Sequence, residues 1–519
     1  MNWRRYGAPI ASAVIIAALI GFSFAGFGAT KAASVLLSGL TLAALYFLLA
    51  AGLSLIFGLM DVLNFAHGIL FMIGAYVGYS TFGNPRLLLN TLPLFLVLLA
   101  GVLVGAALGW PLRAWEKAAR RRLAARESGG ALLRLLRTAL SRLSLSLPLV
   151  LVAGGLMLWA VWGFPLGPLV AFEPTATGGA IPTAAAQEAL LPMTIRLVKM
   201  LAAGLILGPA FAREERERER RRALWRRLAF AGVAVAVGGL MLLARDPLET
   251  FLLGLSVDMR FLLAVLAGAV IGALLGALTE TTLIRPFYGR PITQIVLTLG
   301  LMFMGGELVE SVWGQEGRPP MTMPSLFSES CRSDNLFVWL SERCSSVDLL
   351  GRAFPTYRLF IIVVGVLILV GVGLLLRYSR LGMVIRAGVQ DSEMVEALGI
   401  NVRRVFTQVF ALGSALAALG GVVAAPFVGV YPGMGGTFQL QAFIAVVIGG
   451  MGSYPGTAVG ALLLGLARAF GDALVTGGIA LPFLEQPLRA SPALARASTV
   501  LIMAIVLLVR PAGIFGRKE

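Results

Sequence analysis

Apolar stretches long enough to cross a lipid bilayer recur along the whole chain. A bilayer core takes roughly 20 apolar residues per helix, and such windows predict helices at 10–29, 35–58, 64–82, 92–110, 146–166, 190–211, 228–244, 258–279, 293–311, 359–376, 405–428, 439–450, 456–475 and 495–509. The window 439–450 is too short to span unless it is a half-helix or runs on into its neighbour. The pattern predicts an all-α fold, a polytopic transmembrane helical bundle of about 12–14 helices.

Composition supports a single membrane domain. Hydrophobic residues make up 58% of the 519 positions and charged residues only 13%, so a soluble protein of this length would lack the polar surface to cover itself. Little polar sequence is long enough to form a separate soluble domain. We therefore expect membrane lipid to surround most of the chain.

The net charge of +17 is carried by short loops between the apolar windows. This is the positive-inside pattern rather than a phosphate-binding surface, so we expect no nucleic acid partner. The predicted helix count places the arginine-rich segments on one side: Arg4–Arg5, Arg113–Arg142, Arg213–Arg227, Arg285–Arg290, Arg377–Arg404 and the tail with Arg510, Arg517 and Lys518. The opposite loops, Phe172–Ala189 and Gly314–Pro355, are neutral or slightly acidic. Both termini are therefore predicted to be cytoplasmic.

Two basic segments have more than one interpretation. Met1–Arg5 followed by the apolar run 10–29 is compatible with a signal peptide, but the run is long and lacks a small-x-small cleavage site, which favours a retained first helix. The run Arg213–Arg227 alternates Glu and Arg, which predicts a solvated helical extension with i,i+4 ion pairs. Anionic lipid headgroups are the specific partner that such a run would attract.

The chain lacks the residue patterns of an enzyme. It has one histidine, no Cys-x-x-Cys and no cluster of His, Asp and Glu with metal-ligand spacing, so we expect no metal, no cofactor and no catalytic residue. None of its lysines follows a glycine, which excludes the Gly-Lys-Ser/Thr of a nucleotide-binding loop. If this protein depends on ATP, another subunit hydrolyses it.

Two blocks interrupt the apolar pattern with polar residues. In the first, Gly58 to Tyr76, the residues Asp61, Asn64 and His67 lie next to glycines that weaken a helix. Polar groups at membrane depth are costly unless paired or hydrated, so this block predicts a helix break or a mouth. Two interpretations remain open: the side chains cap helices and bond to the backbone, or they contact a substrate.

The second block runs from Arg377 to Val405 on the arginine-rich side. Asp391 or Ser392 can cap a short helix through Leu398, and Gly399 can end it. A short capped helix between two membrane spans suits docking into a cleft of a cytoplasmic partner. Taken alone, it equally suits an ordinary amphipathic loop.

Together these blocks resemble a known family, the LivH-type permease subunits of branched-chain amino acid ABC importers, which also includes urea and amide importer permeases. The resemblance covers about residues 35–110 and 258–516. It rests on Asn64-Phe-Ala-His-Gly68 with Gly74-Ala-Tyr76, Arg285-Pro286, Arg377-Tyr-Ser-Arg-Leu-Gly382, Ala397-Leu-Gly-Ile400, Gly449-Gly-Met-Gly-Ser-Tyr-Pro-Gly456 and Arg510-Pro-Ala-Gly-Ile514.

The resemblance implies a multi-pass protein of the bacterial inner membrane with several partners. These are a second permease of the LivM type, two cytoplasmic ATPase subunits and a periplasmic substrate-binding protein. It implies a coupling helix at about 386–400 that receives ATPase motion through Arg386, Asp391, Glu396, Ala397 and Gly399. It also implies a translocation path near Asn64, His67, Gly68, Gly449, Gly450 and Gly452.

The chain departs from the family pattern in two respects. Family members usually carry an acidic residue directly after the His-Gly pair, whereas this chain has Ile69. The chain also has additional helices, so we expect four parts: an extra N-terminal helix at 1–30, permease core at 31–110, inserted helices with arginine-rich loops at 111–257, and permease core again at 258–519. We expect the inserted helices to pack outside the moving core.

Cys331 and Cys344, the only cysteines, fall in a predicted periplasmic loop. That compartment is oxidising, and their spacing allows a small disulfide loop worth roughly 3 kcal/mol. The alternative is two free thiols.

Two other functions remain as alternatives. A urea or short-chain amide importer permease would share the same motifs. An ion-coupled secondary transporter should show paired acidic residues inside the membrane, for which Glu280, Glu307 and Glu310 are the candidates.

Overall fold

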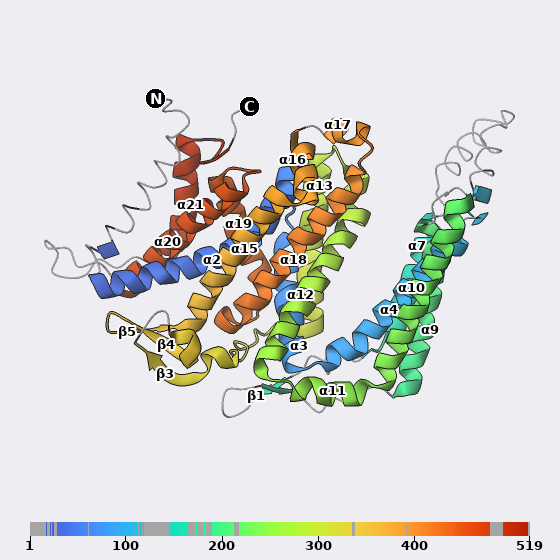
Figure 1. The fold of residues 1–519 in the computed structure, drawn as a ribbon, viewed down its shortest axis with the longest axis horizontal. Helices are drawn as coiled ribbons and strands as arrows, with labels where there is room; N and C mark the ends of the chain where they lie inside the picture. The colour runs from blue at the N-terminus through green and yellow to red at the C-terminus, as the bar shows by residue number, and fades with distance from the viewer. Residues whose placement is uncertain are drawn as a thin grey trace. The chain divides into compact units, whose positions relative to one another are not determined.

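The computed structural model is helical over most of its length (Figure 1). It describes residues 28–516 except 61, most of 110–145, 165–171, 175–179, 183–188, 212–216, 335–337, 391 and 478–490, together with a few positions before residue 28. Within these residues nine helices are long and apolar enough to cross a membrane. The predicted polytopic helical fold is therefore confirmed.

The chain divides into two compact units. The first unit is Met1–Phe82 with Ser256–Glu519, and the second unit is Gly83–Leu255. The described helices of the first unit are α2 (Ala29–Met60), α3 (His67–Gly83), α12 (Val257–Thr279), α13 (Pro291–Trp313), α14 (Trp339–Glu342), α15 (Thr356–Tyr378), α16 (Arg380–Gln390), α17 (Ser392–Ala397), α18 (Val402–Val428), α19 (Met434–Gly449), α20 (Tyr454–Gly477) and α21 (Pro492–Val509).

The predicted windows agree closely with these helices. Every window from 35–58 onward overlaps a helix of the structure, and only 10–29 lies almost entirely outside the described residues. The short window 439–450 belongs to α19, which begins earlier, at Met434. Gly433, with a φ of 86°, turns the chain directly before this helix.

Two largely buried helices form the centre of the first unit. They are α2, which packs against α15, α18, α19 and α20, and α18, which also packs against α12. In α12, α13 and α15, by contrast, fewer than a third of the residues in the apolar stretch are buried. A membrane protein exposes apolar helices in this way because lipid, rather than water, covers its outer face.

Glycines bring these helices to backbone contact. A Cβ atom on Gly465 of α20 would lie 2.4 Å from Ala43 N and 2.5 Å from Gly39 O of α2. A Cβ atom on Gly272 of α12 would lie 2.4 Å from Ala418 Cβ of α18. Membrane helices associate through such close packing, because apolar lipid leaves no hydrophobic driving force between them.

A small sheet forms in the 314–355 loop, which the helical pattern did not predict. Strand β4 (Cys344–Leu349) pairs in parallel with β3 (Glu329–Ser333) and antiparallel with β5 (Arg352–Pro355). A disulfide joins Cys331 to Cys344, so β3 and β4 are linked covalently. In Figure 1 the sheet lies at one end of the first unit, and α16 and α17 lie at the opposite end.

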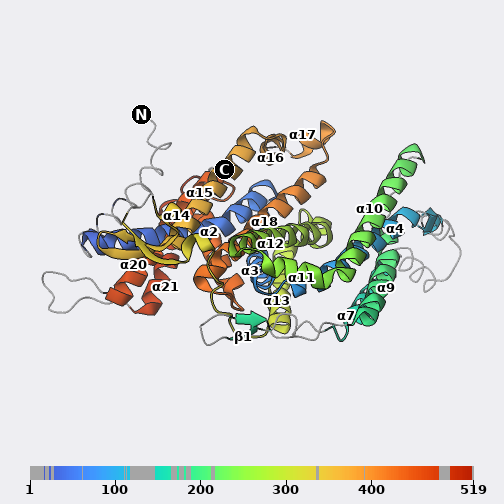
Figure 2. The same ribbon diagram turned by 60° about the horizontal axis from the view of Figure 1, so that its bottom comes forward.

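The second unit contains a separate group of helices, which Figure 2 shows side by side. They are α4 (Arg86–Leu108), α7 (Ser146–Val161), α9 (Leu190–Leu207) and α10 (Glu217–Leu243), followed by the shorter α11 (Arg245–Gly254). Helix α4 packs against α9 and α10, and α7 packs against α9. An ion pair of 2.6 Å between Arg86 Nε and Glu249 Oε1 joins α4 to α11.

This unit also holds two short strands, β1 (Phe172–Pro174) and β2 (Ala180–Pro182). The unit begins at residue 83 because α4 packs on α9 and α10, helices of the expected insertion at 111–257. The expected start of the insertion at residue 111 stays a prediction.

The glycine contacts predict a position-specific cost of adding one methyl group. Gly465→Ala should lower the free energy of unfolding by about 1–3 kcal/mol, because the new Cβ overlaps the backbone of α2. Gly371→Ala is the matched control, since a Cβ there meets open space on α15. Thermal unfolding of the full chain in detergent measures both, and equal stability of the two variants would contradict the packing described above.

Candidate functional site

The first polar block forms a break between α2 and α3. Residues 62–66 are not helical, and Asn64 organises them: its Oδ1 accepts a hydrogen bond from Ala66 N at 3.0 Å, and its carbonyl accepts one from His67 N at 3.3 Å. Asn64 thus starts α3 through its own backbone contacts, as the capping interpretation proposes. Its side-chain nitrogen remains available.

His67 is completely buried where three helices meet. A Cβ on Gly52 of α2 would lie 2.8 Å from His67 Nε2 and 2.3 Å from Gly413 O of α18. The imidazole therefore occupies a space that exists because residue 52 has no side chain. The Leu49 backbone lies beside the ring, yet neither ring nitrogen reaches hydrogen-bond geometry with any described residue.

Gly68 and helix α19 complete the surroundings of the break. A Cβ on Gly68 would lie 2.2 Å from Gly435 O and 2.6 Å from Gln439 Cβ. Gln439 is itself buried, and its Nε2 donates to Asn64 O at 3.3 Å. The structure therefore brings Asn64, His67 and Gly68 together and adds Gln439, which the sequence interpretation did not select.

These helices carry several buried polar atoms that have no hydrogen-bond partner among the described residues. They are Ser54 Oγ, Asn64 Nδ2, both ring nitrogens of His67, Ser414 Oγ and Gln439 Oε1. A buried polar atom without a partner costs about 1–3 kcal/mol, and such atoms normally contact water or a ligand. Three of these residues, Asn64, His67 and Gln439, are brought together by the contacts described above. They are called the polar cluster below, and their free polar atoms are suited to contact a solute.

The glycine segment lies elsewhere. Gly449 is about 15 Å along α19 from Gln439, and its carbonyl accepts a hydrogen bond from Phe515 N at 3.0 Å. Gly450 and Gly452 have φ values of 102° and 79°, which favour glycine. The structure therefore joins the segment to the Arg510–Ile514 motif and does not place it beside His67.

The second polar block forms two short helices rather than one. The expected coupling segment 386–400 covers the end of α16 and all of α17, with Asp391 outside the described residues. Arg386, Glu396, Ala397 and Gly399 are exposed. Gly399, with a φ of 81°, ends the segment as expected, and its N–H donates to Glu396 O at 2.9 Å.

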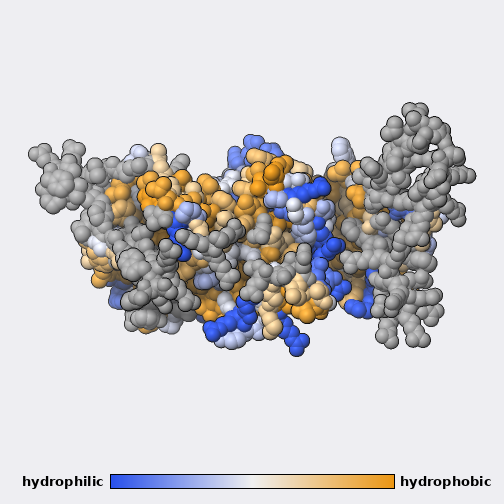
Figure 3. All heavy atoms as spheres, turned by 90° about the horizontal axis from the view of Figure 1, so that it is seen from above, coloured by the Kyte–Doolittle hydropathy of each residue, from blue (hydrophilic) through white to orange (hydrophobic). Residues whose placement is uncertain are grey.

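The face around these helices exposes both basic and apolar side chains. Figure 3 looks onto the end where α16 and α17 lie in Figure 1 and shows hydrophilic residues there beside broad apolar areas. The exposed basic side chains of this end include Arg380, Arg386, Arg403 and Arg404. Only Val395 of the described α17 side chains is buried. The segment is thus largely exposed, and it presents the apolar Met394 and Leu398 as well as polar side chains outward.

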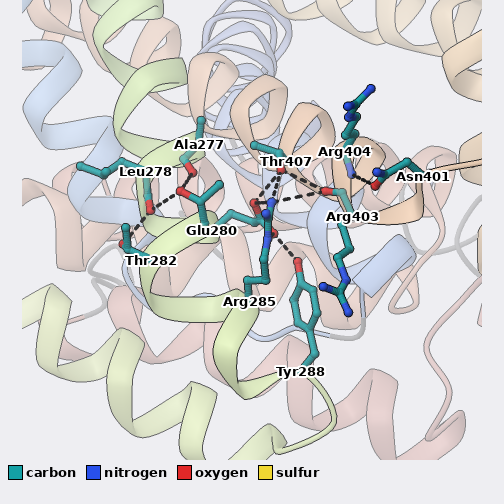
Figure 4. A network of polar contacts seen from close by, with 11 residues as sticks. Ala277, Leu278, Glu280, Thr282, Arg285, Tyr288, Asn401, Arg403, Arg404 and Thr407 are labelled. Atoms are coloured by element: carbon teal, nitrogen blue, oxygen red, sulfur yellow. Dashed lines mark hydrogen bonds and ion pairs between the residues drawn. The ribbon is translucent and has the colours of Figure 1, made fainter. Parts of the chain in front are cut away.

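A buried carboxylate lies close to this segment, at the end of α12 (Figure 4). Glu280 has no exposed surface and begins a π-helical turn, η2 (Glu280–Ile284), which continues into η3 (Arg285–Phe287). Arg285 forms a bidentate pair with it, at 2.8 Å from Nη2 to Oε2 and 3.1 Å from Nε to Oε1. Charge pairing of this geometry offsets the cost of burial.

Two hydroxyl groups complete the pairing of Glu280. Thr407 Oγ1 of α18 donates to Glu280 Oε2 at 2.7 Å and accepts from Arg285 Nη2 at 2.6 Å. Tyr288 also donates to Glu280, and burial, with the nearby carboxylate, raises the pKa of Tyr288 so that it stays a donor. The network therefore ties α12 to α18 just after α17 ends.

The candidate acidic residues of an ion-coupled transporter do not gather. Glu280 lies where α12 ends, whereas Glu307 lies about 24 Å along α13 from that helix's start. Glu307 is exposed, and Glu310 lies one turn further on. The described residues also contain no group of three or more His, Cys, Asp and Glu side chains able to hold a metal ion.

Many membrane helices, a broken helix with unsatisfied polar groups and a polar segment between two spans define the class of membrane permeases. The chain belongs to the family of branched-chain amino acid transport system permease components, whose model matches residues 35–117 and 228–509. Membership makes it a permease subunit of an ABC importer, which functions together with other components.

Curated relatives agree with this family. The high-affinity branched-chain amino acid transport permease LivH of Escherichia coli K12 is 31% identical over 270 residues, 52% of this chain and 79% of the relative. LivH of Salmonella typhimurium is 30% identical over 272 residues, with the same coverage. BraD of Pseudomonas aeruginosa is 31% identical over 267 residues, 51% of this chain and 77% of the relative. No solved structure matches the chain.

The Glu280 network predicts that replacing this one carboxylate with a neutral amide strongly destabilises the fold. Glu280→Gln should lower the free energy of unfolding by about 3 kcal/mol, because Arg285 loses its charged partner. Thr407→Val should cost less, about 1–2 kcal/mol, because the ion pair remains. Chemical unfolding of the full chain in detergent measures both. Glu307→Gln, at an exposed position, is the control, and a Glu280→Gln variant as stable as this control would exclude a structural role of the network.

Proposed function

We propose that this chain is the membrane-spanning subunit of an importer for branched-chain amino acids. The observation that carries the proposal is the family match over residues 35–117 and 228–509, together with relatives whose names specify these substrates. ATP hydrolysis takes place in separate subunits, since no Gly-Lys pair exists in the sequence.

The translocation path passes the polar cluster. Its side chains are neutral hydrogen-bonding groups set among apolar helices, so an amino acid with separated charges and an apolar side chain finds partners for both parts. Gly68 and Gly52 hold the cluster's helices at backbone contact. Gly449, Gly450 and Gly452 contribute indirectly, by fixing α19 to the C-terminal motif.

The segment 386–400 receives motion from the ATPase subunits. Its exposed position, its short helices and its location between α15 and α18 support this role. The Glu280 network then transmits movement, because Thr407 follows α17 by ten residues and is bonded to the end of α12. A movement of α17 is thereby transmitted to both α12 and α18.

The complete importer contains four further components. They are a second permease of the LivM type, two cytoplasmic ATPases and a periplasmic binding protein, with both termini and α17 in the cytoplasm. The arginine-rich loops support this orientation. The disulfide at the opposite end of the first unit agrees with an oxidising periplasm.

The inserted helices at 111–257 and the N-terminal helix at 1–30 are additions to the permease core. The gap between the two matched stretches of the family model, 35–117 and 228–509, supports an insertion. A moving core must keep its shape, whereas helices at its rim can be added without changing the cycle.

The substrate class is tested with the cognate binding protein. Calorimetric titration against leucine, isoleucine, valine, short amides and urea should show heat only for the branched-chain amino acids. Binding of urea or an amide instead would replace the proposed substrate with that of the alternative importer.

The polar cluster predicts a specific transport defect. Gln439→Leu should reduce leucine uptake by roughly tenfold or more, because one hydrogen-bonding group of the path is lost. Uptake into proteoliposomes that contain the whole importer is the measurement. Thr437→Val is the control, since Thr437 is exposed on the same helix and bonds within it. Unchanged uptake by Gln439→Leu would place the path elsewhere.

The coupling segment predicts a different defect. Gly399→Val should lower uptake roughly tenfold while ATP hydrolysis continues, because a β-branched residue is strained at a φ of 81° and distorts the end of α17. Glu396→Arg should act in the same direction. Gly300→Val on α13 is the control, as a Cβ there meets open space. Normal coupling in both variants would rule out this assignment.

A further inference from the structure

A second set of polar atoms without partners involves α3, at a distance from the polar cluster. Tyr76 follows His67 by nine residues, which is about 14 Å along the helix. Its side chain is completely buried, yet its hydroxyl has no hydrogen-bond partner among the described residues. A buried phenol normally finds such a partner. The hydroxyl is therefore free to bond to a water molecule or a solute.

An arginine with a free donor lies close to this phenol. The Tyr76 ring lies 5.2 Å from the ring of Trp313 at the end of α13, and Arg318 Nη2 donates to Trp313 O at 2.8 Å. Arg318 Nε is buried and also lacks a partner. None of the ion pairs between described side chains includes Arg318. Its charge is thus available to a carboxylate from outside the chain.

Backbone contacts fix the position of this arginine. Arg318 N donates to Val430 O at 2.6 Å, and Arg318 O accepts from Val430 N at 3.3 Å. A Cβ on Gly429, which has a φ of 74°, would lie 2.9 Å from Arg318 O. Trp313 is fixed as well, because its Nε1 donates to Ser80 Oγ of α3 at 2.8 Å. The arginine and the phenol are therefore positioned by α3, α13 and the end of α18.

A negative charge belongs to the same group. Glu310 lies one turn before Trp313 on α13, and the charges of Glu310 and Arg318 both act on the Tyr76 hydroxyl. These two side chains form no ion pair with each other. A simple anion is repelled by Glu310 and a simple cation by Arg318, whereas a molecule that carries both charges is attracted by both.

The group lies at the end of the first unit that is opposite to the coupling segment. Helix α18 begins just after α17, and its 27 residues extend about 40 Å to the turn that contains Val430. Figure 1 shows β3, β4 and β5 at this same end. Under the proposed orientation it is the periplasmic end, where a solute enters.

We propose that Arg318, Tyr76 and Glu310 form an entry site for the zwitterionic head group of an amino acid. The inference rests on the proposed function and adds a second solute site to the path. The carboxylate of the solute accepts hydrogen bonds from Arg318 Nε and the Tyr76 hydroxyl, and Glu310 attracts its ammonium group. The polar cluster lies next along α3, further from the periplasmic end.

Tyr76→Phe separates a binding role from a structural one. It removes only a hydroxyl without a partner, so the variant should melt at the same temperature or higher. Leucine uptake by the whole importer in proteoliposomes should nevertheless fall roughly tenfold or more. Tyr357→Phe is the matched control: its hydroxyl donates to Val423 O at 2.8 Å, so this variant should melt earlier and still transport leucine. Normal uptake by Tyr76→Phe would overturn the proposal.

The charged residues are tested by the thermal stabilisation that a bound solute gives the full chain in detergent. Millimolar leucine should raise the melting temperature, whereas leucine amide, which lacks the carboxylate, should not. Arg318→Gln should remove most of the leucine shift, and Arg318→Lys should retain part of it. Glu310→Gln should weaken the response to leucine but not to isocaproate, which is leucine without its amino group.

The remaining outcomes separate the entry site from the proposed function. A full leucine shift in Arg318→Gln would show that the solute binds elsewhere, and the proposed substrate would stand. An equal shift by leucine amide would exclude recognition of the carboxylate. A shift by urea and not by leucine would overturn the proposed substrate, and the entry site with it. No shift by any of these solutes would overturn the entry site.

Discussion

The first unit depends on one constraint: its central helices touch through backbone atoms at glycines. Gly52, Gly413 and His67 show the consequence, because the imidazole fits against α2 and α18 only where no Cβ intervenes. Apolar lipid does not drive helices together, so close packing must supply the attraction. The same contacts fix the polar side chains, since a helix that cannot slide holds its residues at one depth.

Burial of charge follows from this packing and limits where charge can occur. Glu280 is buried at a helix end, where Arg285, Thr407 and Tyr288 satisfy both carboxylate oxygens. The neutral cluster around His67, by contrast, keeps unsatisfied atoms at the centre of the unit. Charge is thus found where the helices are tied together, whereas the proposed translocation path is bordered by amide groups.

The helices could be predicted because apolar length is a direct signature of a bilayer. Asn64, His67 and Gly399 could be found because each breaks the local pattern. Gln439 and Thr407 could not, because a single polar residue near the edge of an apolar stretch is common in sequences and only the fold shows what it faces. The glycine segment was predicted near the path from its motif, which stays a prediction. What the motif did not reveal is that its positive φ values form a turn bonded to the C-terminal segment. The second unit, which begins at residue 83, could not be predicted for a similar reason. The sequence of α4 resembles that of any other membrane span and does not show which helices it packs against.

Asn64 and Gln439, the two amides beside His67, use opposite halves of their side-chain amide groups for internal hydrogen bonds. Asn64 uses its oxygen on its own backbone and keeps a donor, whereas Gln439 uses its nitrogen on the Asn64 carbonyl and keeps an acceptor. If the proposed translocation path is correct, a solute at this level would therefore meet one described group that donates a hydrogen bond and one that accepts it. Molecules that carry both capacities and no net charge fit such a pair, while a simple anion or cation would satisfy only half of it. Under the proposed function, the break between α2 and α3 would thus select for solutes without net charge.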